Sequence, residues 1–222
     1  MNHKTMITEH KHITGAYTAL RHFFEVFDLP SARNYIQTSL LAANSNKLWK
    51  GACPADLVYF YAAYKKLLHA AVVITGSGCI RQTGIITPAE DRPVPDFTNL
   101  NLYCKLYDAT EYWLYIPRHL TVKEFFNPYK ALKKTVRFIR KEDEYDNLFD
   151  TIVQYALSYS SFTDASLEWD TLQLNIMLQK LMEAAYLLHI RTCTKTEHLH
   201  AFDTTYKKTG DAHNTRPGES TI

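Results

Sequence analysis

One eleven-residue segment occurs twice in this chain, and the repetition limits what the chain can fold into. YKKLLHAAVVI begins at Tyr64 and LQKLMEAAYLL begins at Leu178, which places the two copies 114 residues apart. In both copies a Lys-Leu pair is followed, after two further residues, by an Ala-Ala pair. Identity at these positions in register indicates an internal duplication rather than a chance likeness between two leucine-rich segments.

Each copy has the apolar spacing of an amphipathic α-helix. Apolar residues recur at steps of three and four, which places them on one side of a helix. The matching positions are Phe60, Tyr64, Leu67, Ala71 and Ile74 in the first copy, and Leu174, Leu178, Leu181, Ala185 and Leu188 in the second. Asp56 and Asp170 also match, and each is predicted to cap the first turn of its helix.

The similarity extends towards the N-terminal side of each copy. SARNYIQTSLLAANS aligns with NLFDTIVQYALSYSS at an offset of 116, so each copy reads as a helix, a loop and a longer helix. The sequence therefore predicts a mainly α protein, a helical bundle built from a duplicated helix-loop-helix hairpin at about 31–75 and 148–192. A further helix is expected before the first hairpin, ended by Asp28 and Pro30.

Residues 79–117, between the two hairpins, have a different pattern. TPAEDRPVPDFTN holds three prolines and is typical of an extended connection, whereas residues 100–106 alternate and EYWLYI is aromatic and β-prone. We expect a small inserted β-hairpin or an irregular segment here, with a helix over part of it as the alternative. Residues 1–193 then form a single helical domain, and the polar residues 194–222 are expected to be a disordered tail.

Composition and charge argue against several classes of protein. The net charge of +2 predicts no global attraction to nucleic acid, and no stretch holds the 18 apolar residues that a membrane span needs. The four cysteines are widely spaced and include no CxxC pair. We therefore expect a cytoplasmic protein with no membrane contact, no metal site and no cofactor.

Positive charge is concentrated in one region. From Arg118 to Lys141 there are eight Lys or Arg residues against one acidic residue, Glu124. Residues 128–141 have the spacing of a basic amphipathic helix, with Leu132, Val136 and Ile139 opposite the charges. The candidate binding residues for an anionic partner are Arg118, Lys123, Lys130, Lys133, Lys134, Arg137 and Lys141.

Two interpretations of this basic helix stay open. It is either a docking face for an acidic protein or the phosphates of a nucleic acid, or a solvated face that balances the acidic residues at 142–146. No aromatic stacking platform is interleaved with the charges, which argues against nucleic-acid binding.

One pair of residues suggests an enzyme instead. Arg191 is followed by His198 near the end of the last predicted helix, and this spacing is similar to the Arg-x4–6-His motif of HEPN-type ribonucleases, which are helical bundles. The resemblance implies a metal-independent ribonuclease in which Arg191 and His198 are the catalytic residues. Thr192 stands where Asn, Asp or His often follows the arginine in that motif, so the likeness covers two residues plus an all-helical context.

No other catalytic signal is present: there is no GxSxG, HExxH or Walker loop. The sequence thus favours a non-enzymatic cytoplasmic binding or scaffold protein. It would act through the basic helix 128–141 or through the groove between the two hairpins. The alternatives are the ribonuclease and a structural homodimer in which the bundle continues across a two-fold axis.

Overall fold

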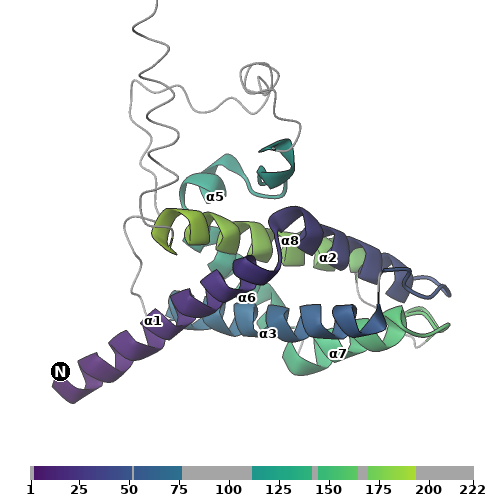
Figure 1. The fold of residues 1–222 in the computed structure, drawn as a ribbon, viewed down its shortest axis with the longest axis horizontal. Helices are drawn as coiled ribbons and strands as arrows, with labels where there is room; N and C mark the ends of the chain where they lie inside the picture. The colour runs from purple at the N-terminus through teal and green to yellow at the C-terminus, as the bar shows by residue number, and fades with distance from the viewer. Residues whose placement is uncertain (1–2, 52, 77–111, 142–144, 165–169, 194–222) are drawn as a thin grey trace, which may run out of the picture.

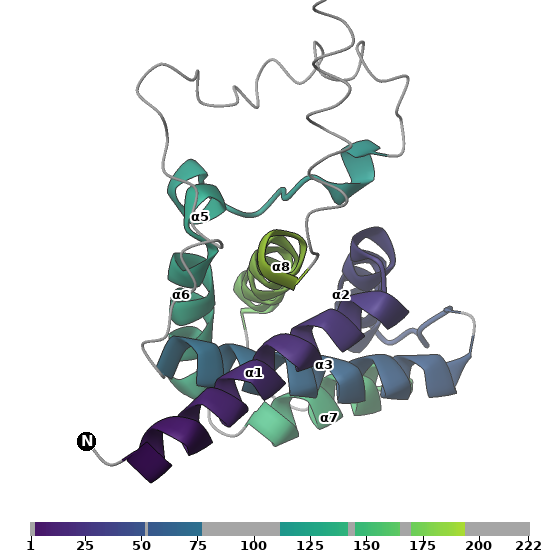
Figure 2. The same cartoon turned by 60° about the vertical axis from the view of Figure 1, so that its left-hand side comes forward.

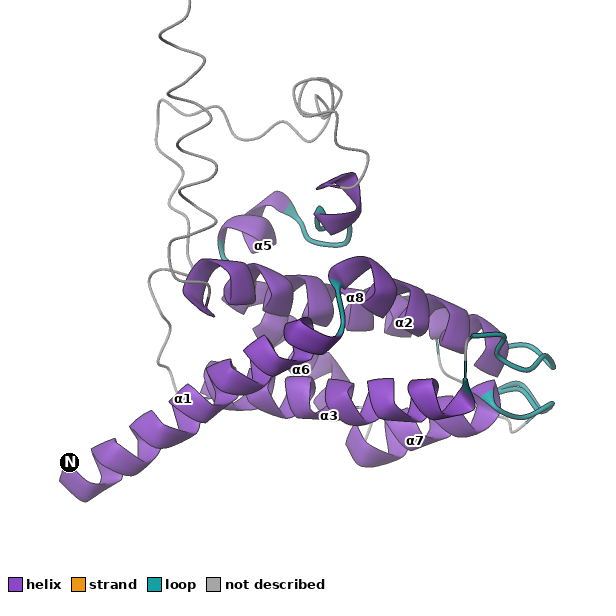
Figure 3. Cartoon of the chain, viewed as in Figure 1, coloured by secondary structure: helices purple, strands orange, loops and turns teal. Residues whose placement is uncertain are grey.

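The regular secondary structure is helical throughout the part of the chain described by the computed structural model, which comprises residues 3–51, 53–76, 112–141, 145–164 and 170–193 (Figure 3). The elements in chain order are α1 (His3–Val26), α2 (Leu29–Ala43), α3 (Pro54–Gly76), the 3₁₀ turn η3 (Tyr112–Tyr115), α5 (Val122–Phe126), α6 (Pro128–Lys141), α7 (Tyr145–Ala156), α8 (Thr171–Leu188) and the π-helical turn η4 (His189–Cys193). The prediction of a mainly α bundle is confirmed.

The helices of the two halves interlock (Figure 1). Helix α2 packs mainly against α7 and α8, and α3 packs mainly against α1, α6 and α7. Helix α1 packs against α3, and α6 packs against α8. The helices of one predicted hairpin therefore make more contact with the other half of the chain than with each other, and their apolar faces share one hydrophobic core.

The break between α1 and α2 is where the sequence predicts it. The Asp28 carboxylate accepts a hydrogen bond from the Ser31 backbone N–H at 2.7 Å, and Pro30 lies in the first turn of α2. This capping satisfies one of the backbone donors that a helix leaves without an intrahelical partner.

The predicted caps of the two long helices differ. Asp170 caps α8 by accepting a hydrogen bond from the Gln173 backbone N–H at 2.9 Å. The prediction for Asp56 is wrong, because α3 begins at Pro54 and Asp56 lies inside the first turn. Pro54 has no N–H to satisfy, so α3 can begin three residues earlier than the position match with α8 implies.

The loop between α2 and α3 and the loop between α7 and α8 each form a hydrogen bond with a helix of the other half of the bundle. The backbone N–H of Trp49 donates to the Ala156 carbonyl at the end of α7 (2.8 Å), and the backbone N–H of Phe162 donates to the Ala43 carbonyl at the end of α2 (2.9 Å). Both bonds satisfy carbonyls that a helix C-terminus leaves free. The two loops thereby lie together at one end of the bundle (Figure 1).

Aromatic side chains fill the space between α1, α2 and α3. Phe60 is wholly buried, and the centre of its ring lies 4.8 Å from that of Tyr35 and 5.2 Å from that of Phe27. Beside it, the hydroxyl of Tyr61 pairs with that of Ser39 at 2.7 Å, and Tyr64 Oη donates to the Leu178 carbonyl at 2.6 Å. Burial raises the pKa of both tyrosines, so both hydroxyls stay neutral.

The strand expected over EYWLYI is not formed, because Tyr112–Tyr115 is a 3₁₀ turn. The carbonyls of this turn and of the residues after it are bonded to a side chain of α2 rather than to a second strand, as described below. The rest of the predicted insert from 79 to 111 and the predicted tail 194–222 lie outside the described residues.

By length and composition alone, one described helix, α3, could cross a membrane, since an 18-residue window of it has a mean hydropathy of 1.3. Half of that window is buried inside the protein. A helix in a protein core meets the same test, so the observation is weak evidence for a membrane span.

Candidate anion-docking surface

Helix α6 is amphipathic in the structure as in the sequence. Pro128 starts it, where a missing N–H leaves no bond unmade. Ala131 and Leu132 are wholly buried, and Val136 and Ile139 are nearly so. This apolar side packs against α8 and α3, which fixes the orientation of the opposite side.

The opposite side carries four exposed cations, Lys130, Lys133, Lys134 and Arg137. Their spacing of three, four and seven residues puts them on one face, about 10 Å long at 1.5 Å per residue. We call these four side chains the basic face. Because the helix is held by its buried side, the basic face is presented to solvent in a fixed orientation.

Among the described side chains, no carboxylate lies within ion-pair distance of the basic face. The positive potential of the basic face is therefore not cancelled by a described neighbour. Its like charges, three and four residues apart, also repel one another. The acidic residues that the sequence suggests as counter-charges, at 142–146, have side chains outside the described part.

The remaining predicted binding residues are placed differently. Arg118 and Lys123 are exposed, but they belong to residues 112–127, which we call the strap. The strap crosses α8 on the outside of the bundle and leads into α6 (Figure 2). The side chain of Lys141 lies outside the described part. The structure therefore brings four of the seven predicted residues together.

The strap is anchored on one buried carboxylate. Glu183 of α8 is wholly buried, and its Oε2 accepts hydrogen bonds from the backbone N–H groups of Arg118 (2.9 Å) and His119 (2.8 Å). Its Oε1 lies 3.0 Å from Nδ1 of His119. Three polar atoms of the strap thus converge on one side chain.

Arg33 of α2 completes this anchor. It donates to Glu183 Oε1 through Nε (3.1 Å) and Nη2 (2.7 Å), and it also donates to the carbonyls of Leu114 and Ile116 in the strap. Burial alone would raise the pKa of Glu183. The hydrogen bonds from His119 and from the two strap N–H groups, together with the charge of Arg33, outweigh burial and lower that pKa below its usual value.

A second ion pair holds the next part of the strap. Lys180, one turn before Glu183 on α8, lies 3.0 Å from Oε2 of Glu124. Glu124 also forms a capping box with Thr121 at the start of α5. Burial opposes ionisation of Glu124, but the hydrogen bonds from Thr121 and Lys180 lower its pKa overall.

Acid is expected to loosen these anchors. The folded-state pKa values of Glu183 and Glu124 lie below the usual 4.5. Their contribution to stability is therefore complete above that pH and is lost as the pH falls through the lower folded value. Thermal melting should give a nearly constant Tm from about pH 7 to pH 5, then a fall, and a shallower fall in Glu124→Gln. An unaltered acid limb in that variant would contradict a role for Glu124.

Arg191, the first residue of the ribonuclease interpretation, is engaged with the strap. Its Nη1 donates to the Phe125 carbonyl at 2.9 Å, and its guanidinium carbon lies 4.8 Å from the centre of the Phe125 ring. Burial lowers its pKa to about 10, so it remains a cation at neutral pH. His198, the second residue of that interpretation, lies outside the described residues.

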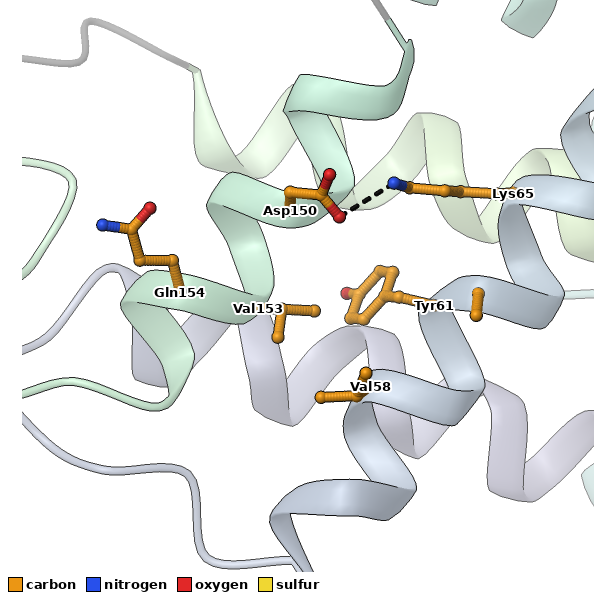
Figure 4. A pocket seen from close by; sticks show the side chains of 7 residues that line it. Val58, Tyr61, Lys65, Asp150, Val153 and Gln154 are labelled. Atoms are coloured by element: carbon orange, nitrogen blue, oxygen red, sulfur yellow. Dashed lines mark hydrogen bonds and ion pairs between the residues drawn. The ribbon is translucent and has the colours of Figure 1, made fainter.

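A groove lies between α3 and α7, that is, between the two predicted hairpins. It has a volume of about 260 Å³ and is lined by Val58, Tyr61, Ala62, Lys65, Asp150, Val153 and Gln154. In Figure 4 the Tyr61 ring stands between Val58 of α3 and Val153 of α7, and Lys65 reaches Asp150 at 2.8 Å along one edge. The lining of the groove is therefore mainly apolar, with the charged pair at one edge.

Sequence reasoning missed the anchor role of Arg33 and Glu183. A signal was present, because each is a charged residue within a helix whose core-facing residues are mostly apolar. The pairing between them, 150 positions apart, depends on how α2 and α8 cross.

Neither a metal site in the described part of the chain nor a relative identifies the chemistry of this protein. Within the described ranges, no group of three or more His, Cys, Asp or Glu side chains is arranged to hold a metal ion. No family model, no curated protein and no solved structure matches this chain.

Proposed function

We propose that this protein is a non-enzymatic binding protein that docks an anionic partner through the basic face of α6. The observation that supports it is a set of four exposed cations on a helix whose opposite side is locked into the core, with no carboxylate among the described side chains close enough to neutralise them. Such a face attracts polyanions over a Debye length of about 10 Å.

The test is binding of two probes, a fluorescent DNA duplex and polyglutamate, to the full chain at several salt concentrations. The variant Lys133→Glu/Lys134→Glu/Arg137→Glu reverses three charges of the basic face. It should bind at least about tenfold more weakly. With the duplex, the slope of log K against log salt should shrink by roughly 0.9 for each lost phosphate contact.

The matched control reverses the exposed residues Lys47, Lys50 and Lys66, which changes the net charge by the same amount at positions outside α6. It should bind nearly as well as the unmodified chain. The duplex and polyglutamate arms tell a nucleic acid from an acidic protein. Equal losses in both variants, or no binding of either probe by the unmodified chain, would overturn the proposal.

We also infer that the bundle is built from a duplicated unit. Several contacts support this. Tyr64 and Leu178, which the repeat aligns, bond to each other. The two loops bond reciprocally to the opposite halves. Helix α1 packs against α3 and α6 packs against α8, so each long helix is contacted by one further helix.

The ribonuclease alternative receives less support. Arg191 already makes a hydrogen bond and a ring contact with Phe125, so it serves as a link between η4 and the strap.

A further inference from the structure

The strap is held on the bundle almost entirely by polar contacts. Among the side chains of residues 114–127 only that of Glu124 is buried, and it is charged. The apolar side chains of Leu114 and Val122 are 44% and 45% exposed, and the others, such as Leu120, are only partly buried. Residues 114–127 therefore add no fully buried apolar side chain to the core that holds the helices together.

The bundle holds the strap through four charged side chains, Arg33, Lys180, Glu183 and Arg191. Apart from the ring contact of Arg191 with Phe125, these contacts are hydrogen bonds or ion pairs. When the strap lifts, water can solvate every polar group that is released, and rehydration of the buried charges offsets much of the lost attraction. Exposure of apolar side chains has no such compensation. Opening of the strap should therefore cost less free energy than unfolding of the core.

The end of the strap at α6 is placed to act as a hinge. Asn127 lies between α5 and α6 with a φ of −129° and a ψ of 85°, which is outside the helical region. Pro128 then starts α6, whose residues Ala131 and Leu132 are wholly buried. Because α6 is held by its buried side, the strap can turn at Asn127 while α6 and its basic face stay in place.

We propose that the strap is a lid that opens as one unit while the helical bundle stays folded. The strap turns about Asn127 and leaves the side of α8 that it crosses (Figure 2). Opening uncovers Arg33, Lys180 and Glu183, the charged side chains that now bond to the strap. Openings of this kind involve the parts of a protein with the fewest buried apolar contacts. The lid is independent of the docking function proposed above, because the basic face of α6 does not move with it.

The test is native-state hydrogen exchange of the full chain, followed by NMR at several low urea concentrations. The reporters are the backbone amides of Arg118 and His119, which donate to Glu183 and exchange when the strap leaves it. Relative to their intrinsic rates, they should exchange at least about tenfold faster than the core amides of α3. Their exchange should also depend only weakly on urea, because opening of the strap exposes little surface.

Two variants separate opening of the lid from unfolding of the bundle. Phe60→Ala weakens the core and should speed exchange of the α3 core amides at least about hundredfold, but it should leave the amides of Arg118 and His119 unchanged. Glu124→Gln weakens the contact with Lys180 and should speed exchange of both reporters about tenfold, although it lies at least five residues from them.

The matched control is Glu25→Ala, which removes an exposed ion pair of α1 and should alter exchange of neither reporter. Reporters that follow the α3 core in their urea dependence or in Phe60→Ala would show that the strap leaves only when the bundle unfolds, which overturns the proposal. So does a Glu124→Gln variant in which Arg118 and His119 exchange as before, because the strap would then not open as one unit. The urea series needs no substitution, so it decides the question even where Phe60→Ala does not fold.

Discussion

Replacing Glu183 with alanine is expected to lower the free energy of unfolding by about 3–5 kcal/mol. The carboxylate is wholly buried and accepts from Arg33, from His119 and from two backbone N–H groups of the strap. Its removal leaves a buried guanidinium without its counter-charge and two amides without an acceptor. An uncompensated buried charge is among the largest penalties that one substitution can create.

The measurement is urea unfolding followed by circular dichroism, with Glu25→Ala as the matched control. Glu25 also pairs with an arginine, Arg21, but its side chain is 56% exposed. The control should change stability by no more than about 0.5 kcal/mol, as is usual for exposed pairs. Similar losses in both variants would contradict an anchoring role for Glu183.

A double variant separates the charge from the packing. Arg33→Met/Glu183→Leu removes both charges at once and refills the space with apolar atoms. It should recover a large part of the stability lost in Glu183→Ala, because no buried charge is then left alone. The strap carbonyls of Leu114 and Ile116 lose a donor in this variant, so recovery should be incomplete. A double variant less stable than Glu183→Ala would assign the loss to the strap contacts alone.

Replacing Phe60 with alanine is expected to cost about 3–5 kcal/mol. The ring is wholly buried and contacts aromatic rings from α1, α2 and α3, with Tyr35 stacked on it at 4.8 Å. Its loss leaves a cavity where three helices meet, and the surrounding rings cannot all move inward to fill it.

The neighbouring residue on the same helix provides the control for this prediction. Tyr59 is 57% exposed, so Tyr59→Ala should cost about 1 kcal/mol or less. Both variants remove an aromatic ring from the same turn of α3, so helix propensity is nearly matched and burial is the main difference. Equal changes in the free energy of unfolding would mean that Phe60 is not part of the packed core.

The helices and their buried sides follow from local information. Step-three and step-four apolar spacing identified the buried sides of α3, α6 and α8, and the Asp28-Pro30 pair located the start of α2. The four cations of the basic face were found by the same rule, since charges at helical spacing opposite an apolar stripe must point to solvent. These features depend on residues within about seven positions of one another.

Interactions between distant segments could not be read in this way. The residues of EYWLYI are β-prone and favour one strand of a small hairpin over an irregular or helical segment, but a strand needs a partner to bond with. In the folded protein Arg33 supplies the donors for Leu114 and Ile116 instead, and Glu183 accepts from the next two amides. The conformation of this segment therefore depends on side chains that lie more than sixty residues away in the sequence.

The sequence by itself determined that this chain is helical, where its amphipathic helices lie and which side of α6 is charged, because those properties are local and periodic. Only the tertiary structure decided that the two halves interlock, that Arg33, Glu183 and Lys180 anchor the strap, and that α3 and α7 form a groove. Those results depend on how helices cross, and crossing is set by the simultaneous packing of many side chains rather than by any short pattern.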